Sequence, residues 1–446
     1  MELSKIFYFS LLLLTYFFSG YIFERHETLI IFFLFFSCFA ITFLVSKKLS
    51  LKEILFFGIS FRLVLFFAYP WLSEDFYRFI WDGLVIGENI NPYEYTPSDL
   101  INKKEIFGTK KILEELYGNI SNLSSLNYSP YPPISQFLFF LSTSFKKDIY
   151  LSLISMRVLI IISDILNFFI GCRILKILKF KQGKIFWYFL NPLVIIELSG
   201  NLHFEGFMLT FLGFGTLLFL ENKKLFSLLP FAFSVGTKLI TIIIIPIIIN
   251  QKKISENLKM MFLFFGLLFF IFFLPIGNNN FPNFFNTIKL WFSNFEFNGS
   301  IYYIIRYLGY KIKGYNIVQS VGLITPLITF IIMFYLTFVR KNKEIKIILE
   351  DIFLLISFFY LISMVVHPWY ITTILYLGLF TNYNFQIIWS ALIFLTYSAY
   401  QNFEVKENFY LIGLEYVVVV GFFIYEFLRQ GNNFSYKDSS KKIIVV

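Results

Sequence analysis

Leu29 to Val45 reads LIIFFLFFSCFAITFLV, a run without a single charged residue. Comparable runs, nearly free of charge, extend over Phe7 to Phe23, Met260 to Leu274, Val318 to Val339 and Tyr410 to Leu428. A helix needs about 20 apolar residues to cross the hydrocarbon layer of a membrane. These runs are too long for strands, and no alternation of period two indicates a membrane barrel. The sequence therefore predicts an all-α polytopic membrane protein.

The composition of the whole chain points the same way. Of its 446 residues, 57% are hydrophobic and only 15% are charged, and the mean hydropathy is +0.71. A soluble chain carries about 25% charged residues, because its domains need polar surface to cover them. The first apolar run lacks a small-x-small cleavage site and a second run follows directly, so we expect a retained span. We expect about 11–14 spans in a single integral membrane domain over residues 1–446.

Basic residues predict the orientation of the chain. Lys and Arg accumulate in cytoplasmic loops, so the net charge of +10 needs no nucleic-acid partner. The C-terminus is then cytoplasmic, and an external loop over 71–133 and a second one over 276–317 lie on the other face with nearly every unusual polar residue. The basic segments are Lys47, Lys48 and Lys52, Arg173 to Lys184, Lys223 and Lys224, Lys252 to Lys259, Arg340 to Lys346, and Arg429 to Lys442.

Two apolar segments do not have the length of a single span. Ile134 to Phe145 is short and is followed by Lys146 and Lys147. Leu225 to Asn250 begins and ends at basic loops and carries Lys238 in its middle. We expect either two short helices or a re-entrant hairpin in the second segment.

The first external loop contains the most informative segment, Ser73-Glu-Asp-Phe-Tyr-Arg-Phe-Ile-Trp-Asp-Gly83. Ser73 is a candidate N-cap and Gly83 suits a helix end. Asp75, Arg78 and Asp82 recur at i, i+3 and i+7, so they share one face of the helix. We predict an amphipathic helix at the membrane surface with its carboxylates towards water. A solvated surface helix without a catalytic role gives the same pattern and stays an alternative.

Several short motifs follow one another in the order of a known family. They resemble bacterial membrane glycosyltransferases of the GT-C superfamily, and nearest the polyprenol-phosphate-mannose-dependent mannosyltransferases of the family 87 type. The resemblance covers most of the chain between Phe61 and Tyr400. Its motifs are Ser73 to Gly83 with Asn91-Pro-Tyr93, Tyr131-Pro-Pro133, Asn191-Pro192, Gly200-Asn-Leu-His-Phe-Glu-Gly206, Lys238 within Thr-Lys-Leu, Phe297-Asn-Gly-Ser-Ile301, and His367-Pro-Trp-Tyr370.

The resemblance implies a fold, a reaction and a base. Family members transfer a sugar from a lipid-linked phosphate donor to an acceptor on the non-cytoplasmic face. For this chain it implies a GT-C-type helical bundle in a bacterial inner membrane, a polyprenyl-phosphate sugar donor, and a glycan or glycolipid acceptor. The catalytic acid of the family maps onto Asp75, with Glu74 as an adjacent competitor.

An inverting transfer of this kind needs one base and some positive charge. A single ionised carboxylate suffices when the leaving group is already a phosphate, and the first-turn position of Asp75 favours the ionised form. Glycosidases, by contrast, need a second, protonated carboxyl group. Phosphate oxygens need cations or hydrogen-bond donors. The candidates for contacts with donor or substrate are Arg78, Asp82, His203, Glu205, Lys238, Arg306 and His367.

Each candidate also has a purely structural interpretation. His203 and Glu205 can cap a helix or pair with each other, and Lys238 can extend its amine to an interface. Arg306 and His367 can belong to the aromatic belt at the membrane surface. A divalent metal is possible, but three histidines without compact ligand spacing predict no particular metal centre. The side chains with suitable ligand atoms are His203, Glu205, Asp75 and Glu74.

Two other functions stay open. A transporter or flippase of lipid-linked saccharides also needs a basic, aromatic cavity. Transporters, however, place charges near the midplane of the membrane and have repeated halves, whereas the polar motifs here gather on one face. A polymerase or ligase with an oligosaccharide donor fits the same pattern. The identity of the sugar, the acceptor and the linkage are left open.

Overall fold

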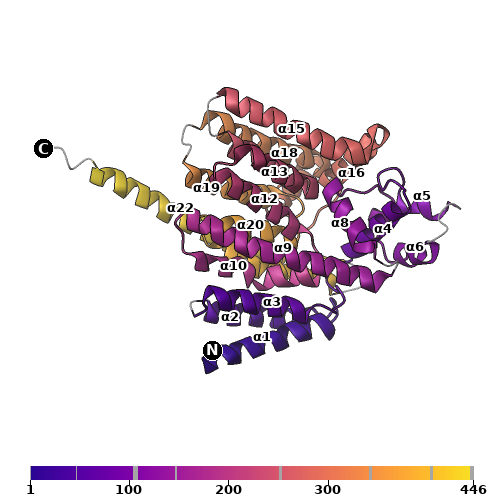
Figure 1. The fold of residues 1–446 in the computed structure, drawn as a ribbon, viewed down its shortest axis with the longest axis horizontal. Coiled ribbons are helices and arrows are strands. Elements are labelled where there is room, and N and C mark those ends of the chain that lie inside the picture. Colours follow the sequence, from indigo (N-terminus) through magenta and orange to yellow (C-terminus); the bar gives the residue numbers. More distant parts are fainter. Residues whose placement is uncertain are drawn as a thin grey trace.

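The computed structural model of the chain describes residues 2–46, 48–103, 109–145, 148–250, 254–340, 344–401 and 405–441. Within these ranges every regular element is helical, and the only extended pairing is an isolated β-bridge between Phe297 and Val365. Figure 1 shows the long helices side by side, with α4, α5, α6 and α8 gathered at one end. At the other end α22 extends away towards the C-terminus (Figure 1). The predicted all-α class is confirmed.

Six helices in the described part of the chain are long and apolar enough to cross a membrane. They coincide with the five apolar runs of the sequence and add one further span. The polytopic prediction is therefore confirmed, while the expected number of crossings stays a prediction. The six are α1 (Leu3–Tyr21), α2 (Thr28–Val45), α9 (Ile149–Ile177), α15 (Ile254–Ile276), α18 (Val318–Phe334) with its π-helical continuation η5 (Tyr335–Val339), and α22 (Phe409–Lys441).

The other apolar segments are shorter, broken or, over Ile345–Ile362, carry three charged residues, and for these reasons fewer helices have the length and composition of a span than expected. They are α3 (Leu51–Val64), η1 (Gln182–Ile185), α10 (Phe186–Phe189), α11 (Pro192–Val194), η2 (Ile195–Gly200), α12 (Glu205–Leu220), α13 (Lys224–Thr237), η3 (Leu239–Ile243), α14 (Ile245–Ile249), α19 (Ile345–Ile362), η6 (Pro368–Tyr370), α20 (Ile371–Gly378), α21 (Phe385–Leu392) and η7 (Ile393–Tyr400).

Two of these breaks position candidate residues. The helical path bends by 113° between Pro192–Gly200 and Glu205–Leu220. Arg157 of α9 stabilises this bend, because its guanidinium donates to the carbonyl oxygens of Ser199 at 2.7 Å and Gly200 at 3.2 Å. The second break lies in Leu225 to Asn250, where Lys238 has an extended backbone (φ −145°, ψ 125°) between two helical pieces. The interruption of this segment at its lysine is as expected.

The loop predicted to be the first external one contains α4 (Asp75–Gly87), α5 (Pro97–Ile101), α6 (Lys110–Tyr117) and α7 (Asn122–Ser125), and it leads into α8 (Pro133–Thr143). The helix predicted from Ser73 to Gly83 exists, but both of its ends were placed wrongly. Glu74 is the N-cap residue, while the Ser73 hydroxyl accepts a hydrogen bond from the Asp75 amide at 3.3 Å. The helix continues past Gly83 to Gly87. Gly83 does not end the helix but allows α4 to pack closely against α8. A Cβ atom there would lie 2.5 Å from the carbonyl oxygen of Phe139 in α8.

The loop predicted to be the second external one contains η4 (Asn278–Asn280), α16 (Phe281–Ser293) and α17 (Ser300–Lys313). The orientation of the chain stays a prediction. Several basic residues on which it depends lie outside the described residues, namely Lys47, Lys252, Lys253, Lys341, Lys343 and Lys442. Lys146 and Lys147, which follow the short segment Ile134 to Phe145, lie outside them too. Residues 104–108 of the first loop and 402–404 of the last external turn lie outside them as well.

Candidate active site

Asp75 is the first residue of α4, and its side chain is half-buried. Removal from water raises the pKa of this carboxyl group from 3.8 to about 6. The positive charge of Lys238 opposes the shift, and the negative charges of Glu205 and Glu74 add to it. The helix N-terminus was expected to favour the ionised form, but burial outweighs it. The broken segments thus bring residues far apart in sequence close enough to act on one carboxyl group.

Lys238 and Glu205 form an ion pair beside Asp75. The lysine Nζ lies 2.7 Å from Glu205 Oε1, with the lysine side chain 25% exposed and the glutamate 3% exposed. The angle is outside hydrogen-bond geometry, so neither Glu205 oxygen has a hydrogen-bond partner among the described residues. The Lys238 ammonium also lies 6.0 Å from the centre of the Tyr370 ring. About a quarter of the Lys238 side chain therefore stays accessible to solvent or to a ligand.

His203 and His367 lie on the two faces of one tryptophan. The ring centres of His203 and Trp369 are 3.7 Å apart, and those of His367 and Trp369 are 4.4 Å apart. Loss of water, followed by the nearby charge of Lys238, lowers the pKa of His367 to about 3. A neutral His367 can still donate a hydrogen bond, and its predicted contact with donor or substrate stays a prediction. Its position beside the other site residues is as expected.

Glu197 was not among the predicted site residues. Its carboxylate accepts a hydrogen bond from the Tyr397 hydroxyl at 2.8 Å and from the Asn201 amide at 3.3 Å. The unpartnered Nε2 of His203 lies 3.8 Å from the same carboxylate. A single acid inside an apolar run was the available signal, since ionisable groups within spans usually face a polar interior.

Arg25 was also missed. It comes from the turn between the first two spans, and its guanidinium lies 2.5 Å from the Glu74 carboxylate. The same guanidinium stacks 4.7 Å from the centre of the Tyr400 ring. Arg25 therefore lies next to the acid that competes with Asp75, and it is a second cation near the site. Its signal was a charged residue in the short turn between two apolar runs.

Arg78 and Asp82 do share a face of α4, but that face is buried rather than solvated. Arg78 Nε donates to Asp82 Oδ1 at 2.8 Å, and the other Asp82 oxygen accepts from Ser129 and Gln136. Arg78 also donates to backbone carbonyl oxygens of the 121–127 segment. The prediction that this face points to water is wrong, because the loop after α7 folds over it. The pair holds the loop on α4.

Arg306 lies in a different group of side chains. It pairs with Glu296, and its guanidinium is 4.4 Å from the centre of the Tyr303 ring. Its predicted convergence with Asp75 is therefore not found among the contacts of the described residues. Its connection to the site is indirect. Phe297 follows Glu296, the partner of Arg306, and the centre of its ring lies 5.0 Å from that of His367.

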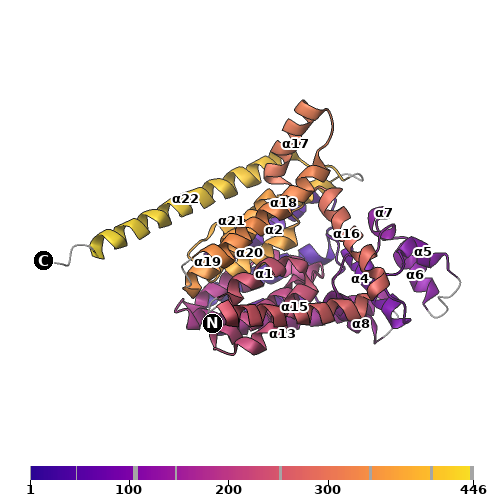
Figure 2. The same ribbon diagram turned by 90° about the horizontal axis from the view of Figure 1, so that it is seen from above.

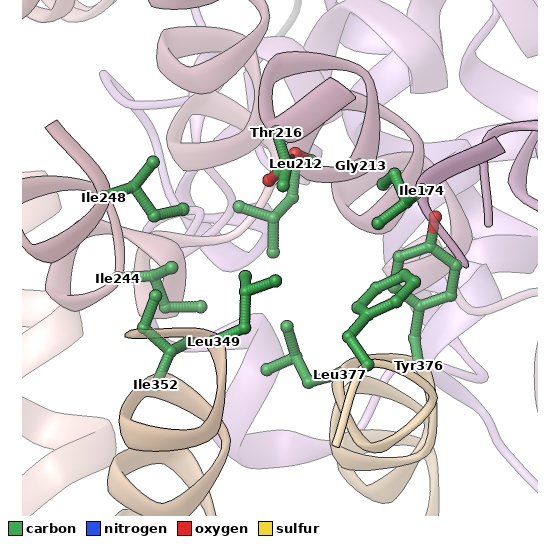
Figure 3. A pocket seen from close by; sticks show the side chains of 11 residues that line it. Ile174, Leu212, Gly213, Thr216, Ile244, Ile248, Leu349, Ile352, Tyr376 and Leu377 are labelled. Carbon is green, nitrogen blue, oxygen red and sulfur yellow. Dashed lines mark hydrogen bonds between the residues drawn. The ribbon is translucent and has the colours of Figure 1, made fainter. Parts of the chain in front are cut away.

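No group of three or more His, Cys, Asp or Glu side chains in the described part of the chain has the geometry to hold a metal ion. A small apolar cavity, drawn in Figure 3, lies elsewhere, between α9, α12, α14, α19 and α20. Its polar lining groups are Thr216 and Tyr376, and it contains none of the candidate residues. Asp75 and its neighbours are therefore the described groups best suited to the chemistry of transfer.

The chain was compared with known proteins. A family model described as the alpha-(1->6)-mannopyranosyltransferase N-terminal domain matches residues 28–251, half of the chain. No curated protein and no solved structure gives a significant match. The matched range includes Asp75, Glu205 and Lys238, whereas His367 lies beyond it. The chain belongs to the MptA/B family of alpha-(1->6)-mannopyranosyltransferases and is a glycosyltransferase.

Proposed function

We propose that this glycosyltransferase moves mannose from a polyprenyl-phosphate donor to a glycan or glycolipid acceptor, with Asp75 as the general base. The reaction takes place on the non-cytoplasmic face of a bacterial inner membrane. One observation carries the proposal. A half-buried carboxyl group with a pKa of about 6 lies beside a partly exposed lysine, in the loop-rich end of a bundle of apolar helices (Figure 1).

The pKa of Asp75 suits a base that works near neutral pH. A carboxylate with a pKa of about 6 is largely ionised there and is more basic than an ordinary aspartate. Asp75 takes the proton of the acceptor hydroxyl while that oxygen attacks the anomeric carbon. The bond from this carbon to the phosphate oxygen breaks, and the lipid phosphate leaves with the electron pair. The family description names an alpha linkage, so an inverting reaction requires a donor whose phosphate is β-linked.

Lys238 and Arg25 are the cations available for the phosphate. Both are partly exposed, at 25% and 29% of their side chains, and each is held by a glutamate. Preorganised positive charge stabilises the negative charge that grows on the leaving group. No second, protonated carboxyl group is needed, because the leaving phosphate is a weak base. Glu205 and Glu74 then act as positioning residues for the two cations.

The aromatic stack forms a wall rather than a platform for the sugar. Both faces of Trp369 are covered by imidazole rings, so this indole has no free face for a mannose ring. The neutral His367 can donate or accept a hydrogen bond without adding positive charge. The wall therefore shapes the site and excludes water, while the charges come from Lys238 and Arg25.

Transfer assays with the purified protein in vesicles test this function. Radiolabelled mannose is supplied either on polyprenyl phosphate or on a nucleotide, with a panel of mannosides and glycolipids as acceptors. The expected result is labelled product from the lipid donor alone, with release of one polyprenyl phosphate for each sugar transferred. Transfer from the nucleotide sugar without lipid would reject the proposed donor. Movement of the intact lipid-linked sugar across the vesicle without transfer would instead indicate a flippase.

A further inference from the structure

Helix α17 (Ser300–Lys313) has one face of large side chains that are at least half exposed. Ile304 is 64% exposed, Tyr307 61%, Leu308 51% and Ile312 77%. With the exposed Lys311, these residues recur at i, i+3, i+4, i+7 and i+8. This spacing gives one continuous stripe along the helix. The stripe mixes aliphatic, tyrosine and lysine side chains.

The opposite face of α17 is fixed to the rest of the protein. Tyr302 is fully buried, and the Tyr303 hydroxyl donates to Glu407 near the start of α22. Gly309 packs so closely that a Cβ atom would lie 2.6 Å from Ile317. The helix also contacts α19 and α22. These contacts fix the rotation of α17 about its axis, and this rotation leaves the apolar stripe exposed.

The direction of α17 differs from that of the spans. Figure 2 shows it leaving the bundle where α22 begins and running across the direction of α15 and α22. Since α15 and α22 are long enough to cross the membrane, a helix across them runs along the membrane plane. The chain preceding α17 packs on the active-site wall, through Phe297 and His367. This places α17 on the same side of the membrane as the Asp75 site.

We propose that α17 is a membrane-interface helix, which inserts its apolar stripe between the lipids and binds anionic headgroups through Lys311 and Lys313. Interfacial helices combine apolar residues on the buried face with basic residues at the headgroup level. Both lysines are exposed in the last turn of the helix. The proposal concerns contact with lipid and does not depend on which sugar is transferred.

The depth of α17 in a bilayer is measurable with spin labels on single cysteines. The native Cys38 and Cys172 are buried and free, so each is replaced by alanine before Ile304→Cys, Leu308→Cys or Ile312→Cys is introduced. Two reference positions bracket the result. Ile331→Cys in α18 reports the hydrocarbon layer, and Asn119→Cys in the first external loop reports water.

In vesicles, the three labels on α17 should collide several-fold more often with oxygen than with a water-soluble nickel chelate, as at position 331. Collision rates like those at position 119 would overturn the proposal, because the stripe would then face water. Poor access of both quenchers, with spin–spin broadening that grows with protein density, would also overturn it. That result would mean that a second copy of the chain covers the stripe.

The lysines are tested by charge reversal. In an equal mixture of phosphatidylcholine and phosphatidylglycerol, the wild-type labels should lie deeper than in phosphatidylcholine alone. Lys311→Glu with Lys313→Glu should abolish this difference. The matched control, Lys110→Glu with Lys111→Glu on α6, removes two exposed lysines of the first external loop and should leave the difference intact. An unchanged lipid response in the α17 variant, or its loss in the control, would contradict headgroup binding by α17.

Discussion

The carboxyl group of Asp75 is half-buried next to a lysine and two glutamates, and burial raises its pKa to about 6. The folded-state pKa lies above the ordinary value of 3.8, so the free energy of unfolding decreases as the pH rises from 3.8 to about 6. The ionised carboxylate lowers the free energy of unfolding by at most about 3 kcal/mol, and by less than that because solvent still reaches the group. Asp75→Asn should therefore raise the melting temperature in detergent at about pH 8. A lower melting temperature would mean that the carboxylate stabilises the fold.

The ionisation of Asp75 should also control how kcat/KM falls at low pH, the acid limb of the pH profile. The base must be ionised, so kcat/KM should fall about tenfold for each pH unit below the pKa. Lys238 lowers the pKa of Asp75, and Lys238→Met should therefore move the limb to higher pH as well as raise the KM for the donor. Lys110→Met, which removes an exposed lysine of the first external loop, is the control and should do neither. If the acid limb stays at the same pH when Lys238 is replaced, the charge of this lysine does not act on the base.

Sequence reasoning found the residue types of the site better than their partners. Asp75, Glu205, Lys238, His203 and His367 were all predicted, and the structure brings them close together. Glu197 and Arg25 were missed, because their partners Tyr397, Glu74 and Tyr400 come from remote segments. Spacing placed Arg78 and Asp82 on one face of α4, but it could not reveal that Ser129 and Gln136 cover that face.

At the scale of elements, the contact between α4 and α8 holds Asp75 in position. A Cβ atom at Gly83 would lie 2.5 Å from a backbone oxygen of Phe139, which cannot move aside as a flexible side chain can. Gly83→Ala should therefore destabilise the protein by about 1–3 kcal/mol, as overpacking does. Thermal unfolding in detergent measures the change.

Gly87 provides the matched control on the same helix. Its added Cβ atom would meet nothing closer than 4.0 Å, and alanine is a better helix former than glycine. Gly87→Ala should therefore keep or slightly raise the melting temperature. Equal effects of the two substitutions would show that the α4–α8 contact is looser than the structure has it.

Long unbroken helices could be predicted from the sequence, whereas broken ones could not be placed. An apolar run of span length predicts its helix by composition alone, as Leu29 to Val45 does for α2. The bend before α12 depends on Arg157, which donates to two carbonyl oxygens from another helix. The break in Leu225 to Asn250 was expected, because that segment begins and ends at basic loops. The end of α4 was misplaced because Gly83 was interpreted locally, although its role is contact with α8.

At the scale of the whole molecule, orientation is the main prediction still open. A membrane-impermeant thiol reagent should label Asn119→Cys from the outside of intact cells. It should reach Lys181→Cys, in the second basic segment, only after the cells are opened. The native cysteines are buried and should give little background. Labelling of Lys181→Cys in intact cells would invert the orientation and move the Asp75 site to the cytoplasm.

The all-helical class, the membrane location and the family could each be predicted from the sequence, because hydropathy and the order of the motifs can be recognised in a single chain. The number of crossings could not, because several apolar segments fold as short pieces whose path depends on their neighbours. The donor, the acceptor and the base are properties of the assembled site. They need measurement.

The most direct test is the transfer of radiolabelled mannose from polyprenyl phosphate mannose by wild-type protein, Asp75→Asn and Glu74→Gln, compared at equal amounts of folded protein. Asp75→Asn should lower kcat by about 10²–10⁴-fold, while Glu74→Gln should retain most of the turnover. Full turnover by Asp75→Asn, with loss in Glu74→Gln, would contradict the assignment of Asp75 as the base.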